Sequence, residues 1–330
     1  MTTLAVEILS VVFALLPIVA ALIVALVADR LGGKSLALLA AVIVWGAIGA
    51  AYSSIWTYEI TLAPVEGRVS AGKLDVFTAV FMAPVVEEFW KALVLIPIVA
   101  LGRMRTLADG ALFGLGAGIG FAISENLMYF EHAYLYGGTG EWAATVVIRT
   151  TFTAGLHALN TALVGAALGL AYMHGRWIVG TVFYSAPALV LAMVIHLTWN
   201  ALASLDELMT KGFGSLLGMA LLAATGFALL ALLLMALGWE RRLILHELHE
   251  EAAHGLIPPD HPRAVSRWRG RRGTWAPWWT HRRAYAHALV DLALLKSRAR
   301  RMQPPRWDRG WNAVDECRAR VQWLLEGWRV

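Results

Sequence analysis

The chain has 330 residues, of which 58% are hydrophobic and only 15% are charged. Soluble domains carry about 25% charged residues, so this composition excludes an ordinary soluble enzyme, and the high hydrophobicity excludes disorder over most of the chain. The single cysteine, Cys317, cannot form a disulfide within the chain or a Cys-x-x-Cys metal site. We therefore expect a membrane protein that does not use thiol redox chemistry.

Charge divides the chain into two parts. Residues 1–238 carry 10 Lys and Arg against 13 Asp and Glu, whereas residues 239–330 carry 18 Lys and Arg against 10 Asp and Glu. The net charge of +5 therefore comes from the tail alone. We expect a transmembrane domain over 1–238 and a basic, Trp-rich cytoplasmic tail over 239–330.

Apolar runs fill the first part of the chain. A helix needs about 20 apolar residues to cross roughly 30 Å of hydrocarbon. The runs of about that length or more are 8–28, 36–56, 76–100, 107–130, 150–173, 177–205 and 214–238. The sequence thus predicts an all-α, polytopic membrane protein with about seven transmembrane helices and a helical tail. The loops on the side of the tail hold five basic residues, and the loops on the other side hold three. Basic residues favour the cytoplasmic side of a membrane. We therefore expect a plasma-membrane protein with its N-terminus outside and its tail in the cytoplasm.

Few ionisable or amide residues interrupt these runs. Charge at bilayer depth costs several kcal/mol, so such residues are candidates for function. For some of these residues the depth can be counted from charged residues that mark the outer ends of the helices. At 1.5 Å per residue, they lie roughly 9 to 18 Å below the outer boundary of the membrane. The candidate catalytic residues are Glu87, Glu88, Lys91, Glu125, Asn126, His157, His196 and Asn200.

The third run contains Glu87, Glu88 and Lys91 on one helix face. A structural ion pair explains one carboxylate but leaves the other without a cation. Glu125 has no cation within one helical turn, so we expect its partner on another helix. Arg149 lies near a helix end, and we assign it no chemistry; a role facing the substrate is the alternative. Glycines precede Glu125 at 110, 114, 116, 118 and 120, and small residues in a membrane helix predict close helix packing.

Several protease chemistries are excluded by the residues present. The membrane runs lack a Gly-flanked serine near a histidine, and their interiors lack aspartate. The histidines of residues 246–254 are spaced by 3 and 5, which misses the zinc motif His-Glu-x-x-His, and we expect a solvated helix there. Glutamates, histidines and amides remain, and this set suits activation of water.

Two routes to that activation stay open. In the first, a buried glutamate acts as general base on the water. In the second, two histidines and a glutamate hold a metal. The candidate ligands are Glu125, His157 and His196, and the candidate ion is zinc. Lys91 and the amides would then stabilise an oxyanion. A proton-coupled transporter, or a scaffold that uses Glu and His to join helices, is the alternative reading.

Four motifs in chain order resemble the PrsW family of intramembrane proteases, which is related to the type II CAAX-processing proteases. They are Glu-Glu-x-x-Lys at 87–91, Phe-x-x-x-Glu-Asn at 121–126, the helix of His157, and His-x-x-x-Asn at 196–200. The resemblance implies a metalloprotease that hydrolyses a peptide bond of a single-span membrane protein, such as an anti-sigma factor, on its outer side. It assigns the paired-glutamate motif to Glu87 and Glu88, the second motif to Glu125, and the histidine motifs to His157 and His196.

The basic tail lies outside the family pattern. Arginine and tryptophan alternate over 263–283, which predicts contact with anionic lipid headgroups rather than with nucleic acid. We expect helices at 284–301 and 312–328, on either side of Pro304 and Pro305.

Overall fold

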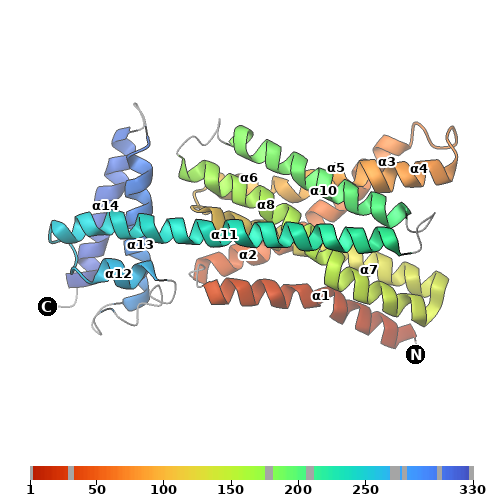
Figure 1. Cartoon of the computed structure of the whole chain (residues 1–330), viewed down its shortest axis with the longest axis horizontal. Coiled ribbons are helices and arrows are strands. Elements are labelled where there is room, and N and C mark those ends of the chain that lie inside the picture. The colour runs from red at the N-terminus through yellow and green to blue at the C-terminus, as the bar shows by residue number, and fades with distance from the viewer. Residues whose placement is uncertain are drawn as a thin grey trace.

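The computed structural model describes residues 3–28, 33–174, 181–205, 212–267, 276, 281–302 and 307–326. Within these ranges every regular element is a helix, so the predicted all-α class is confirmed (Figure 1). The loop residues 175–180 and 206–211, Pro304 and Pro305, and most of the Arg- and Trp-rich stretch, 268–275 and 277–280, lie outside the described residues.

The first part of the chain is a bundle of long helices (Figure 1). Its elements are α1 (Thr3–Ala28), α2 (Gly33–Val44), η1 (Trp45–Ala50), α3 (Ala51–Leu62), α4 (Ala71–Phe77), η2 (Thr78–Met82), α5 (Ala83–Leu93), α6 (Leu95–Ala100), α7 (Leu107–Ile148), η3 (Arg149–Thr153), α8 (Ala154–Met173), η4 (Thr181–Ser185), α10 (Ala186–Leu205) and α11 (Phe213–Ala253). Over the residues that the structure describes, each expected apolar run falls on one of these helices or on a consecutive series of them.

Four helical segments among the described residues are long and apolar enough to cross a membrane. They are Leu36–Leu62, Leu107–Met173, Val182–Leu205 and Phe213–Ala253. The second is 67 residues long and contains two antiparallel halves, because the chain turns at Gly138, whose φ of 72° breaks the helix. The chain is therefore a membrane protein, while the count of seven crossings stays a prediction.

The glycines of α7 allow its backbone to touch α8. A Cβ atom on Gly110, Gly114 or Gly118 would lie between 1.9 and 2.2 Å from a backbone oxygen of α8. The opposing oxygens belong to Gly165, Thr161 and His157. The predicted close packing is confirmed, and it fixes His157 against α7.

Four π-helical segments occur in the described bundle, and each leads directly into a helix that carries a polar residue of the site described below. Two of them, η2 and η4, end two residues before Pro84 and Pro187. Proline cannot donate the hydrogen bond that would continue the preceding helix, and π turns are a usual way to absorb that loss. The turns also rotate the following helices, α5 and α10.

The tail forms a small helical domain with its own core. Helix α11 continues through the predicted boundary at 238 to Ala253, and α12 (His261–Ser266), α13 (Arg282–Ala299) and α14 (Trp307–Glu326) pack around its end (Figure 1). Helices α13 and α14 overlap the two helices predicted for the tail. The core is built on residues such as Ile244, Leu248, Tyr285, Leu289 and Val321.

One expectation about the tail is wrong. The helix at 246–254 is not solvated all round, because α13 and α14 cover one of its faces. Glu247 and Glu251 are buried there, and Lys296 of α13 lies 2.6 Å from Glu251 Oε1 and 3.7 Å from Glu247 Oε2. Arg318 of α14 also pairs with Glu251, at 2.7 Å.

Candidate active site

Helices far apart in the sequence bring their polar residues to one buried place inside the bundle. Glu87, Glu88 and Lys91 come from α5, His157 from α8 and His196 from α10. All five side chains are buried; Glu88, Lys91 and His157 have no exposed surface. The rings of the two histidines lie edge to face with centroids 5.1 Å apart. Residues separated by more than 100 positions therefore form one cluster.

Glu88 is the centre of the hydrogen bonds in this cluster. Its Oε1 lies 2.7 Å from the ammonium of Lys91 and 2.9 Å from Nδ1 of His196. The amide of Asn160 donates to the same oxygen at 3.5 Å and to the carbonyl of Ala192 at 3.2 Å. Lys91 also lies 3.0 Å from Nδ1 of His157. Glu88 thus links its own helix, α5, to α8 and α10, and its negative charge neutralises the buried lysine.

Glu87 is bound much less completely. Its Oε1 accepts a hydrogen bond of 2.9 Å from the Tyr58 hydroxyl on α3. Its Oε2 lies 3.9 Å from both the Lys91 ammonium and Nε2 of His196, and it has no hydrogen-bond partner among the described residues. Lys91 therefore pairs with Glu88, and one oxygen of Glu87 is left facing the histidines.

Glu125 of α7 belongs to a second group beside this cluster. Its carboxylate lies 2.9 Å from Nη2 of Arg149 in η3 and 2.5 Å from Nε2 of His157. Arg149 also donates from Nε to Oδ1 of Asn126 at 3.2 Å and stacks on the Tyr129 ring at 3.5 Å. The prediction that Glu125 finds its partner elsewhere in the bundle is confirmed. The expectation that Arg149 is merely a helix-end residue is wrong, because its guanidinium turns inward.

Asn200 is not joined to the cluster by any contact in the described part of the chain. Its amide donates to the backbone carbonyl of Ala79 at 2.7 Å, which ties α10 to η2. Tyr58 and Asn160 were missed. Asn160 lies three residues after His157 and so shares its helix face, which is a usable signal. No sequence signal marks Tyr58, because a tyrosine is common in an apolar helix and does not by itself indicate a site.

A metal would fit the cluster through a different carboxylate from the one expected. Ligand atoms of Glu87, His157 and His196 all lie within 4.8 Å of one another, so Glu87 takes the place predicted for Glu125. Oε2 of Glu87 and Nε2 of His157 are buried without a hydrogen-bond partner in the described structure. Nε2 of His157 also lies 2.5 Å from Oε2 of Glu125, the distance of a close ion pair.

The tautomer of His196 also suits a ligand. A carboxylate can only accept, so Nδ1 of His196 donates to Glu88, and the lone pair is left on Nε2. Metal-binding histidines are commonly oriented by a carboxylate in this way. One carboxylate and two histidines with an open fourth position are the ligands of many catalytic zinc sites.

Comparison with known protein families decides the assignment. The PrsW family intramembrane metalloprotease model matches residues 34–237, which is more than half of the chain and includes every residue of the cluster. The chain belongs to the PrsW family. It is thus a membrane-embedded member of a hydrolase family, and the metalloprotease description implies a metal. No curated protein and no solved structure matches the chain. The PrsW match ends before the tail.

Proposed function

We propose that this PrsW-family protein is an endopeptidase that hydrolyses a peptide bond of a single-span membrane protein, such as an anti-sigma factor-like regulator. The observation that carries the proposal is the buried group of Glu87, His157 and His196, whose ligand atoms lie within 4.8 Å of one another. Charged and imidazole groups at bilayer depth mark functional sites, and this one combines a carboxylate oxygen with a histidine lone pair.

Glu87 is the residue that acts on the water. Its Oε2 has no hydrogen-bond partner in the described structure, whereas Oε1 of Glu88 is shared among Lys91, His196 and Asn160. In the route without a metal, Glu87 can therefore hold the attacking water, take its proton while the water adds to the scissile carbonyl, and return that proton to the leaving amine when the C–N bond breaks. Glu88 keeps His196 in one tautomer and one orientation.

The other polar residues place charge around the reacting carbonyl. Nδ2 of Asn126 is buried and has no hydrogen-bond partner among the described residues, so it is the candidate donor to the oxyanion. Arg149 holds Asn126 through Oδ1, which leaves that amide nitrogen free. Lys91, which has no exposed surface, orders Glu88 and His157 instead of meeting substrate.

Glu87, His157 and His196 would hold the metal, with zinc as the proposed ion. When bound, the metal would supply Lewis acidity for activating water and polarising the carbonyl. Coordination through Nε2 of His157 places that ring's proton on Nδ1, which faces Lys91 at 3.0 Å. Lys91 would then have to turn away from that nitrogen. A water activated by Glu87 alone uses the same residues and requires no such change.

The proposed topology puts this chemistry at an outer-half depth. Seven crossings, with the N-terminus outside and the tail in the cytoplasm of a plasma-membrane protein, follow from the apolar runs and the basic loops. A substrate helix would enter the bundle sideways from the lipid and be cut near its outer end.

The proposal can be tested without knowing the substrate in advance, by mapping new protein N-termini across a whole membrane fraction. Membranes from cells that express the wild-type chain are compared with membranes that contain Glu87→Gln, with Glu59→Gln as the control because Glu59 is exposed on α3. We expect new termini within single-span proteins for the wild type and the control only. Identical termini in all three samples would contradict the proposal.

A further inference from the structure

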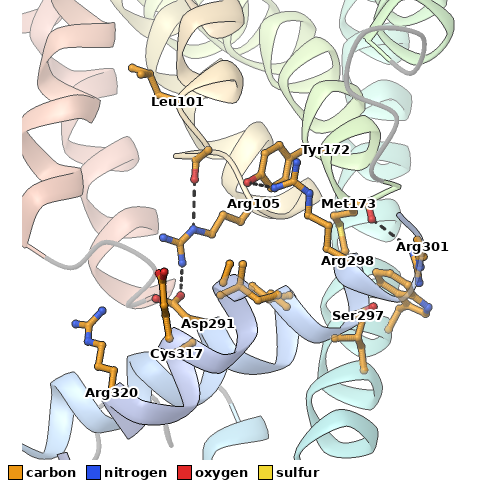
Figure 2. Close-up of a pocket in the computed structure, with 17 residues that line it drawn as sticks. Leu101, Arg105, Tyr172, Met173, Asp291, Ser297, Arg298, Arg301, Cys317 and Arg320 are labelled. Atoms are coloured by element: carbon orange, nitrogen blue, oxygen red, sulfur yellow. Dashed lines mark hydrogen bonds and ion pairs between the residues drawn. The ribbon is translucent and has the colours of Figure 1, made fainter. Parts of the chain in front are cut away.

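A cavity of about 510 Å³ separates the tail from the end of the helix bundle. Its walls come from the α6–α7 connection, the end of α8, the middle of α11, and the tail helices α13 and α14 (Figure 2). The polar cluster of Glu87 and the histidines contributes no lining residue. The cavity is therefore a second site, separate from the candidate active site.

Arginines dominate the polar lining. Figure 2 shows Arg105 from the membrane part and Arg298, Arg301 and Arg320 from the tail around the space. The lining contains two carboxylates, and Asp291 is already paired with Arg105. The remaining charge is positive.

Two of these guanidinium groups keep unused hydrogen-bond donors. Arg320 is exposed, and it makes no hydrogen bond or ion pair with a residue that the structure describes. Arg298 donates to the Tyr172 hydroxyl at 2.5 Å and stacks on its ring at 3.9 Å, but its buried Nε has no partner in the described chain. A guanidinium presents five N–H donors in a planar fork that matches phosphate oxygens.

The position of the cavity corresponds to the headgroup level of a bilayer. Helix α11 has 41 residues, or about 60 Å, which is twice the roughly 30 Å of a hydrocarbon core, so it must project into water. Trp239 lies where its apolar sequence ends, and Tyr172 lies at the end of α8. Tryptophan and tyrosine prefer this interface.

A largely apolar groove, whose lining also includes Thr106, His174 and Glu240, leads from the cavity along the bundle. It has a volume of about 380 Å³ and shares Met173 and Trp239 with the cavity. Leu170, Leu232 and Met235 line it farther from the tail. A ligand that fills both spaces has an anionic head and an apolar chain.

We propose that the cavity binds the phosphate-containing headgroup of an anionic phospholipid, with Arg298 of α13 and Arg320 of α14 contacting the headgroup from different walls of the cavity and an acyl chain in the groove beside α11. The lipid would join the membrane helices to the tail domain. This site depends on the proposed membrane level of α11 but not on the catalytic residues, so its test needs no activity measurement.

Thermal unfolding of the purified full chain in non-ionic detergent tests the site. Phosphatidylglycerol is titrated into the sample, and phosphatidylcholine and soluble glycerol 3-phosphate serve as comparisons. A ligand that binds only the folded state raises the midpoint of unfolding with its concentration. We expect phosphatidylglycerol to raise it, and the two comparison compounds to have no effect at equal concentration.

Variants assign the effect to the cavity. Arg320→Gln should weaken phosphatidylglycerol binding at least about tenfold, because the variant loses a charge-assisted hydrogen bond to the headgroup. Arg320 makes no contact that the fold requires, so this variant remains informative if Arg298→Gln loosens the tail. Arg103→Gln is the matched control, since Arg103 is exposed near Arg105 but does not line the cavity.

Three results would overturn the proposal. They are the absence of a shift with phosphatidylglycerol, an equal shift with phosphatidylcholine, and an equal loss of binding in Arg103→Gln and Arg320→Gln. An equal shift with glycerol 3-phosphate would overturn the lipid as the source of the phosphate.

Discussion

Oε1 of Glu88 lies 2.9 Å from Nδ1 of His196 inside the helix bundle. The same oxygen lies 2.7 Å from the Lys91 ammonium, so one carboxylate orients an imidazole and neutralises a buried cation. The adjacent Glu87 keeps Oε2 without a hydrogen-bond partner in the described structure. Two neighbouring glutamates thus have different environments, and we infer different roles from them.

Glu88→Gln should reduce catalysis without abolishing it. Loss of a carboxylate that orients a metal-binding histidine typically costs 10- to 100-fold in affinity or activity. The variant also leaves Lys91 buried without its anion, which costs about 3 kcal/mol of folding free energy. Cleavage rate and thermal unfolding of purified protein measure the two effects.

A second variant separates these effects. Glu88→Gln combined with Lys91→Met removes both charges, so its stability should recover while its activity stays low. Recovery of activity along with stability would show that Glu88 acts only through the stability of the fold.

The metal site distinguishes Glu87 from Glu125. We expect purified wild-type protein to bind about one zinc ion, in agreement with a site of three protein ligands. Glu87→Gln should lose it, and Glu125→Gln should retain more of it, because Glu125 touches Nε2 of His157 but is paired with Arg149 and lies outside the group of three. Elemental analysis after dialysis measures the content. Loss in Glu125→Gln with retention in Glu87→Gln would favour the ligand set expected from the sequence.

The contact between α7 and α8 should be essential for activity. In Gly118→Ala the added Cβ would lie 2.2 Å from the carbonyl oxygen of His157, so the two helices must separate. Overpacking of this kind costs about 1–3 kcal/mol, and a displacement of about 1 Å at a catalytic group can cost about 100-fold in rate. Cleavage assays and thermal unfolding measure both effects.

Gly140→Ala is the matched control for this substitution. No atom lies within 4 Å of a Cβ at Gly140, and its backbone has no positive φ. Alanine is the better helix former, so stability should be unchanged or slightly higher. Equal losses in Gly118→Ala and Gly140→Ala would contradict the role of the helix contact.

Sequence reasoning found the members of the site but not all of their pairings. Glu87, His157 and His196 stand out because ionisable groups are rare in apolar runs. Which glutamate faces the histidines depends on how π turns rotate the helices, and apolar periodicity does not record that rotation. Tyr58 reaches Glu87 only because α3 packs beside α5. Arg149 was misjudged because its place in the sequence suggested a helix end.

The thiol of Cys317 in the tail should react slowly with alkylating reagents. Cys317 is buried in α14, and burial raises the pKa of its thiol to about 11. The thiolate is the reactive form, so at pH 8 about one thiol in a thousand is reactive, against about a quarter for an exposed cysteine. Iodoacetamide should therefore modify native protein at least about 100-fold more slowly than protein in denaturant. Rapid labelling of native protein, followed by mass spectrometry of the single cysteine, would contradict the burial of Cys317 at the wall of the cavity.

The most direct test of the central claim is cleavage of a single-span substrate, identified by terminal mapping, by purified protein in detergent. The wild type and Glu59→Gln should release the same product at similar rates. Glu87→Gln, folded to the same midpoint of unfolding, should release none. A normal rate in Glu87→Gln would contradict the assignment of hydrolysis to the cluster of Glu87, His157 and His196.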